Sequence, residues 1–79
     1  MVSFKIRLVT IEDVRNFVTA ANMQLCDADI VSDRYRVNAK SLLGIFGLDL
    51  SEPVEVQVYG TEHDAEQFKE AVKSIVVEE

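Results

Sequence analysis

Residues 27–48, DADIVSDRYRVNAKSLLGIFGL, hold the pattern that decides the fold. Asp27–Ser32 and Tyr35–Asn38 are short strand candidates, and Asp33-Arg34 forms the turn between them. Strands joined by a two-residue turn run antiparallel and pair with each other. This hairpin therefore predicts a sheet that is mostly antiparallel.

A short helix follows the hairpin. We expect it to begin with Ser41 as its N-cap and to close near Gly47, which can take the left-handed conformation found after many helices. The Ser41 hydroxyl then satisfies a free backbone N–H of the first turn. A phosphate at the same place would meet free N–H groups and the positive end of the helix dipole, with Lys40 adjacent. Ser41 is therefore both a helix cap and a candidate phosphorylation site.

The apolar residues of this short helix cannot all be buried. Leu42 and Ile45 lie one turn apart and share one face. Leu43 and Phe46 share another face. A helix that lies on a sheet buries only one of these pairs fully, so the other forms an apolar patch beside Ser41. The alternative is that Leu43 or Phe46 packs under the preceding helix.

The residues before the hairpin predict one strand and one helix. Apolar and polar side chains alternate over residues 2–8, which indicates a strand with one buried face. Thr10 then caps a helix over residues 11–22, with Asp13 at its third position completing a capping box. The buried face of the strand holds Phe4, Ile6 and Leu8.

The residues after the short helix predict a further strand and helix. Val54–Tyr59 alternates apolar and polar side chains and indicates a strand. Gly60 ends it, and Thr61 caps a helix that we expect to continue to the C-terminus. The apolar stripe of this helix consists of Ala65, Phe68, Val72, Ile75 and Val76.

Together these elements predict an α+β fold for one domain over residues 1–79. Their order is βαββαβα, and each strand has one apolar face. The expected fold is an open-faced two-layer sandwich, with a four-stranded, mostly antiparallel sheet and three helices on one face. Pairing of the first and last strands would bring Lys5 and Arg7 near Glu55, and opposite charges across strands favour it.

The composition argues against binding to nucleic acid or insertion into a membrane. The chain has 8 Lys and Arg against 14 Asp and Glu, a net charge of −6, and residues 52–79 supply all of it. Nucleic-acid binding needs a cationic surface, which this charge opposes. The lone Cys26 allows no internal disulfide, and no apolar run is long enough for a membrane span. We expect a cytoplasmic protein, a monomer or a weak dimer.

Few residues suit catalysis. His63, the single histidine, lies between Glu62 and Asp64, which is a poor ligand set for a transition metal. The simpler interpretation of His63 is a solvated residue in the first turn of a helix. Cys26 is a small apolar residue rather than a nucleophile, because nothing near it in the sequence supplies a base. We therefore expect no enzyme activity, no metal and no cofactor.

Residues 37–48, VNAKSLLGIFGL, resemble the regulatory-serine segment of the histidine-containing phosphocarrier protein (HPr) family of the bacterial sugar phosphotransferase system. The Lys-Ser-hydrophobic-hydrophobic-Gly core carries the resemblance. The predicted element order is similar to that family's open-faced sandwich, so the resemblance extends over nearly the whole chain. It implies that HPr kinase phosphorylates Ser41 and that the phosphoserine form binds a catabolite repressor of transcription.

The carrier segment of that family is altered here. HPr carries phosphate on a histidine in a Gly-x-His-x-Arg-Pro segment, and Thr10 falls at the place of the histidine and Glu12 at that of the arginine. A threonine hydroxyl is a weak nucleophile without an adjacent base, and Glu12 would repel a phosphoryl group. Arg15 can substitute for the arginine only in part. The resemblance therefore implies a member without the carrier histidine that keeps the regulatory serine.

The resemblance also implies a surface for partner proteins. Lys40, Leu43 and Phe46 would form it, with Thr10 and Arg15 nearby. A second interpretation is an HPr-fold interaction module that uses Leu43 and Phe46 without phosphorylation. A third is a small ligand-binding domain, which is disfavoured because the first strand–helix junction lacks a glycine.

Overall fold

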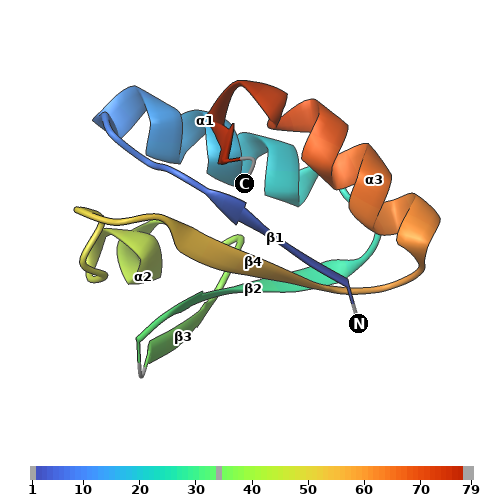
Figure 1. The fold of residues 1–79 in the computed structure, drawn as a ribbon, viewed down its shortest axis with the longest axis horizontal. Coiled ribbons are helices and arrows are strands. Elements are labelled where there is room, and N and C mark those ends of the chain that lie inside the picture. The colour runs from blue at the N-terminus through green and yellow to red at the C-terminus, as the bar shows by residue number, and fades with distance from the viewer. Residues whose placement is uncertain (1, 34, 78–79) are drawn as a thin grey trace.

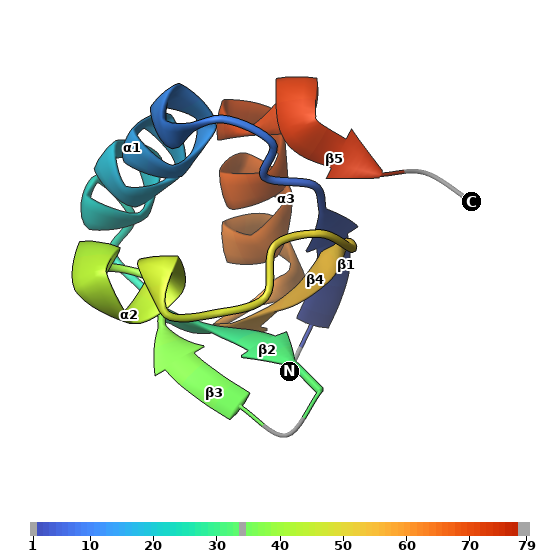
Figure 2. The ribbon, with the colours of Figure 1, turned by 90° about the vertical axis from the view of Figure 1, so that its left-hand side faces the viewer.

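Three helices cover one face of a five-stranded sheet in the computed structural model, which describes residues 2–33 and 35–77 (Figure 1). The strands are β1 (Val2–Ile6), β2 (Asp27–Ser32), β3 (Tyr35–Asn38), β4 (Val54–Tyr59) and β5 (Val76–Val77). The helices are α1 (Ile11–Asn22), α2 (Leu42–Phe46) and α3 (Glu62–Ala71), and a 3₁₀ turn spans Lys73–Ile75. The end view in Figure 2 shows the helices on one side of the sheet, as predicted for an open-faced α+β sandwich.

The strand order is β3-β2-β4-β1-β5, and each described pairing is antiparallel. The predicted pairing of the first strand with β4 is confirmed, since Lys5 lies opposite Glu55 on the uncovered face. Opposite charges facing each other across two strands stabilise this register. Arg7 lies beyond the end of β1, and its backbone N–H donates to the Ile75 carbonyl over 2.8 Å.

Most predicted boundaries agree with the structure. The predicted bounds of α1, β2, β3 and β4 are confirmed to the residue. β1 ends at Ile6 rather than at Leu8, although Leu8 remains buried. Asp33 has a φ of 52°, as the hairpin turn requires, while Arg34 lies outside the described residues.

The prediction that the last helix continues to the C-terminus is wrong. α3 ends at Ala71, and after the 3₁₀ turn the chain forms β5, which pairs with Lys5 and Ile6 of β1. Val76 and Val77 are β-branched, which favours a strand over a helix, and the edge of β1 offers unpaired backbone groups. The sheet therefore has five described strands rather than four. The predicted helix also included residues 78–79, which lie outside the described residues.

The expectation of a left-handed Gly47 is also wrong. Gly47 closes α2 with a φ of −79°, in the right-handed region. Its N–H donates to the carbonyls of Leu43 and Gly44, and the N–H of Leu48 donates to Ile45. These bonds continue the right-handed turn by one residue, so the carbonyls at the end of α2 are satisfied without a left-handed cap.

Aromatic rings join the sheet to the two longer helices. The ring of Phe68 on α3 stacks on Phe17 of α1 at a centroid distance of 5.4 Å. It also meets Phe4 of β1 edge-on at 5.9 Å. The fully buried aliphatic residues around these rings are Ile6, Val14, Ile30, Ile45, Val56 and Val58.

Capping boxes begin both longer helices. Thr10 accepts from the Asp13 N–H over 3.0 Å, and the Asp13 carboxylate accepts from the backbone N–H groups of Val9 and Thr10 over 3.0 and 3.1 Å. Thr61 and Asp64 form the same pair at the start of α3. The bonds from Val9 and Thr10 hold the pKa of Asp13 below its usual value of 3.8.

The aromatic contacts predict a strong effect of one truncation. Phe68→Ala should lower the free energy of unfolding by about 3–5 kcal/mol, because it removes a fully buried ring and leaves a cavity. Urea denaturation measures this loss, with Leu25→Ala as the control because Leu25 is fully exposed and its loss should change stability by less than about 0.5 kcal/mol. A Phe68→Ala loss no larger than that of the control would contradict the assigned core.

The capping box at Thr10 predicts a pH dependence of stability. The lowered pKa of Asp13 means that its charged form stabilises the fold, so this contribution is present above pH 3.8 and lost as pH falls through the lower folded value. Asp13→Asn should cost about 0.5 kcal/mol at neutral pH and flatten the acid side of the stability profile. Urea denaturation at several acidic pH values tests this. Glu12→Gln, which removes a charge from the same helical turn, should keep the wild-type slope, and equal slopes for all three proteins would refute the assignment.

Candidate functional site

The loop before α1 and the loop after α2 meet at one end of the molecule (Figures 1 and 2). They enclose an open pocket of about 440 Å³. The residues that line it are Arg7, Leu8, Val9, Thr10, Ile11, Val14, Phe46, Leu50 and Ser51. The structure therefore brings together two segments singled out from the sequence, around Thr10 and around Phe46.

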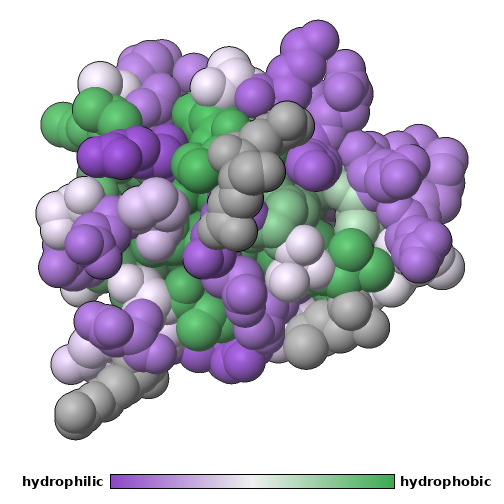
Figure 3. All heavy atoms as spheres, in the orientation of Figure 1, coloured by the Kyte–Doolittle hydropathy of each residue, from purple (hydrophilic) through white to green (hydrophobic). Residues whose placement is uncertain are grey.

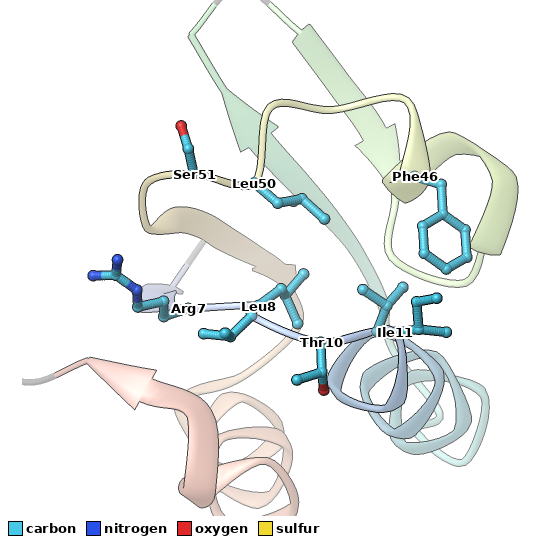
Figure 4. Close-up of a pocket in the computed structure, with 9 residues that line it drawn as sticks. Arg7, Leu8, Thr10, Ile11, Phe46, Leu50 and Ser51 are labelled. Atoms are coloured by element: carbon cyan, nitrogen blue, oxygen red, sulfur yellow. The ribbon is translucent and has the colours of Figure 1, made fainter.

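The inner wall of this pocket is apolar. In Figure 4 the ring of Phe46 points toward Ile11 at the start of α1, and Leu50 points toward Leu8. The Arg7 side chain points away from this space. Ile11 is 66% exposed and Phe46 43%, so the pocket opens onto an apolar surface that the fold leaves only partly covered.

Ser41 is the N-cap of α2, as predicted. Its Oγ accepts from the Gly44 N–H over 3.1 Å, and its side chain is half-buried. A Cβ atom on Gly44 would lie 2.9 Å from this oxygen, which is closer than such atoms approach. Glycine at position 44 therefore leaves the room that the Ser41 hydroxyl occupies.

Lys40 lies directly before this cap. Its backbone N–H donates to Asn38 Oδ1 over 2.8 Å, which holds the turn that leads from β3 into α2. Its Nζ is 4.0 Å from an oxygen of Asp27, whose side chain is 80% exposed. Such a long, solvated ion pair contributes little to stability, so the Lys40 ammonium can turn to another anion at small cost.

The two apolar pairs of α2 differ in burial. Ile45 is fully buried and Leu42 is 36% exposed, whereas Leu43 is 85% and Phe46 43% exposed. Leu43 is therefore exposed as the first alternative predicted, while Phe46 fits the second alternative in part. Phe46 is covered in part by the start of α1, and Leu43 projects into solvent.

The two remaining predicted site residues, Thr10 and Arg15, differ in their position relative to the pocket. The Thr10 hydroxyl serves the capping box, and in Figure 4 its side chain points away from Phe46. Arg15 is exposed on α1 and is not among the described residues that line the pocket. The structure thus places Thr10 at the edge of the pocket and leaves Arg15 outside it.

The loop that holds Leu50 and Ser51 follows from the sequence, but its contribution to the pocket was not predicted. The Asp49 carboxylate accepts from the Ser51 hydroxyl over 2.6 Å and from its backbone N–H over 3.0 Å. These two bonds lower the pKa of Asp49. The alternation of Leu48 and Leu50 with polar residues was the available signal, since Leu48 is buried and Leu50 lines the pocket.

His63 and Cys26 do not join the pocket. His63 lies in the first turn of α3, which begins at the opposite end of the molecule (Figure 1). Cys26 is half-buried in the segment before β2. Among residues 2–33 and 35–77, there is no group of three or more His, Cys, Asp or Glu side chains arranged to hold a metal, and none of the helices is long and apolar enough to cross a membrane.

Comparison with known proteins places this geometry in a family. The sequence family described as "PTS HPr component phosphorylation site" matches residues 14–78. The crystal structure of phosphocarrier protein HPr from Bacillus anthracis str. Ames is similar to this chain, with a TM-score of 0.75 and 28% identity over 96% of both chains. Among curated proteins, no sequence matches.

The family match covers α2 and its serine as well as most of α1 and α3, but begins after Thr10 and Glu12. The fold match covers nearly the whole of both chains. The chain belongs to the HPr family of the phosphotransferase system, whose phosphocarrier proteins interact with other proteins of that system and are not themselves enzymes.

Proposed function

We propose that this chain is a regulatory member of the HPr family, switched by phosphorylation at Ser41 and unable to carry phosphate as a phosphohistidine. HPr kinase is its proposed modifying enzyme and a catabolite repressor its proposed partner, both in the cytoplasm. The observation that carries the proposal is the position of Ser41 at the start of α2, between Lys40 and the exposed Leu43.

The chemistry at Thr10 argues against a carrier. Its hydroxyl accepts from the Asp13 N–H, and no base lies beside it in the sequence to take its proton. A phosphothreonine is a stable ester that would not pass its phosphate on, and the neighbouring Glu12 would repel it. The single histidine, His63, belongs to α3, which begins at the far end of the molecule.

The surroundings of Ser41 suit a charge switch. A phosphate there adds a charge of about −2 at the border of the apolar surface formed by Leu43 and Phe46. Lys40 is the nearest cation in the sequence, and its long contact with Asp27 leaves it able to turn toward the phosphate. A partner that reads both the phosphate and the apolar pair would then distinguish the two forms of the protein.

A second candidate function rests on the same apolar pair. Leu43 is 85% exposed in the unmodified chain, so the surface is available without phosphorylation. An interaction module that uses Leu43 and Phe46 without phosphorylation would bind its partner equally well as wild type and as a Ser41 variant that cannot be phosphorylated.

Phosphorylation at Ser41 has a direct test. Incubation with HPr kinase and ATP should add the mass of one phosphate to the wild-type chain, and peptide mapping should place it on Ser41. The same reaction on Ser41→Asn should add none, since asparagine keeps the helix cap but has no hydroxyl. Ser41→Ala is the poorer control, because loss of the cap costs about 1 kcal/mol and can disturb α2.

An unmodified wild-type chain, with a kinase shown active on the Bacillus anthracis HPr, would refute the switch. The interaction module would then be the better description. A phosphate that persists in Ser41→Asn would show that another hydroxyl is the acceptor, and would refute the assignment to Ser41.

The loss of carrier function has a separate test. The phosphotransferase enzymes that phosphorylate an ordinary HPr should transfer no acid-labile phosphate to this chain, because phosphohistidine requires a nucleophilic ring at the pocket. Radiolabelled phosphate retained on the protein measures the transfer, and the Bacillus anthracis HPr is the positive control. Acid-labile label that disappears in His63→Gln would show that His63 carries phosphate, and would contradict the proposal.

A further inference from the structure

We propose that the groove between the end of α1 and the outer side of α3 binds a segment of a partner protein that carries apolar side chains beside lysines or arginines. This α1–α3 groove has a volume of about 570 Å³. The residues that line it are Met23, Gln24, His63, Glu66, Gln67, Glu70 and Ala71. The site is separate from the pocket lined by Thr10 and Phe46 and does not depend on phosphorylation.

Apolar side chains project at one end of the groove. Met23 caps α1 and is 76% exposed, and Leu25, two residues later, is fully exposed. The described fold buries neither side chain, so each contributes little hydrophobic free energy to folding. Met23 lines the groove, and Leu25 directly follows Gln24, which also lines it. A single exposed apolar residue is ordinary, whereas two large ones so close together in the chain form the kind of surface that marks a binding site.

Acidic side chains form the other wall. Glu66 and Glu70 lie one turn apart on α3, and His63 lies one turn before Glu66. Of the described residues that line the groove, none is a lysine or an arginine. Hydrophilic side chains gather over α3 in the space-filling view, at the right of Figure 3.

Two basic residues, Lys69 of α3 and Lys73 of the following 3₁₀ turn, lie at an adjacent hollow. They line it together with Val76 and with Glu66 and Glu70, so the two glutamates border both hollows. Lys73 pairs with Glu70 over 3.3 Å, and both side chains are more than 70% exposed. Such a pair is weak in water, so Glu70 remains available to a cation in the α1–α3 groove.

The negative charge of this part of the chain indicates which class of molecule can bind in the α1–α3 groove. Residues 52–79 hold eight acidic and two basic residues and supply the whole net charge of −6, which repels nucleic acid and anionic lipid alike. A second copy of the chain would bring the same negative charge. A protein segment that carries apolar side chains beside basic ones fits both parts of the surface. Its apolar side chains would pack on Met23 and Leu25, and its lysines or arginines would pair with Glu66 and Glu70.

The groove and the pocket lined by Thr10 and Phe46 lie at opposite ends of the molecule. α1 and α3 both run between the two ends, with α1 beginning at the pocket and ending at the groove (Figure 1). One protein can therefore hold partners at both sites at once. The geometry points to an adaptor that joins two proteins.

The proposal is tested with a synthetic probe on the full chain. A helical peptide of leucines and lysines, with one apolar and one basic face, is titrated into ¹⁵N-labelled protein while amide chemical shifts are recorded. The expected shifts centre on residues 20–25 and 62–71 and leave residues 40–51 unchanged. A peptide with glutamates in place of the lysines should not bind.

Two matched charge reversals distinguish binding of the peptide in the groove from its general attraction to an acidic protein. Glu66→Lys should weaken peptide binding by about tenfold or more. Glu52→Lys changes the net charge equally on an exposed loop outside the groove and should leave binding within about twofold. Met23→Ser should weaken binding as Glu66→Lys does, whereas Leu43→Ser, at the opposite end, should not.

Three results would overturn the proposal. The first is equal weakening by Glu66→Lys and Glu52→Lys, which indicates attraction to net charge alone. The second is shifts centred on Ile11, Leu43 and Phe46, which place the peptide in the other pocket. The third is dimerisation of the protein through Met23 and Leu25, seen by sedimentation before peptide is added, because a second copy would then be the occupant.

Discussion

The contact of Phe68 with two other rings holds the layers of this protein together. Phe4 comes from the sheet and Phe17 from α1, so one side chain of α3 joins the sheet to both longer helices. A chain of 79 residues buries a smaller fraction of its surface than a larger domain does, so a few such contacts carry much of its stability. The stacked pair of Phe17 and Phe68 also holds α1 against α3, while the Thr10–Asp13 capping box sets where α1 begins beside the pocket.

The hydroxyls of Thr10 and Ser41 both cap a helix, but the Ser41 cap contains fewer hydrogen bonds. Thr10 belongs to a reciprocal box, since Asp13 also binds the backbone before the helix. Ser41 accepts a single N–H, from Gly44, at the start of a helix of five residues. Disturbing the Thr10 cap therefore lowers the free energy of unfolding more than disturbing the Ser41 cap does. A covalent modification is less costly at Ser41 than at Thr10.

The local patterns in the sequence predicted most of this fold and part of the site. Alternation identified β1 and β4, the turn at residues 33–34 joined the strand candidates β2 and β3, and the Thr10–Asp13 box located α1. Each of these signals lies within a few residues of the element that it defines. β5 was missed because it exists through pairing with the edge of β1, some 70 residues away in the chain. The exposure of Leu43 depended on how α2 rests against its neighbours, and the pocket wall at Leu50 on how the loop after α2 folds back toward the start of α1.

The fold accepts more residue types at position 41 than the proposed phosphorylation switch does. Serine, threonine, aspartate and asparagine all cap a helix, and Gly44 leaves room for a small oxygen-bearing side chain. Only the two hydroxyl residues among them accept a phosphate. The cap alone also gives no reason for Leu43 to face solvent beside it, since a polar residue there would satisfy α2 equally well. The cap accounts for the hydroxyl at position 41, whereas the exposed leucine two residues later is accounted for by the proposed partner and not by packing within the described residues.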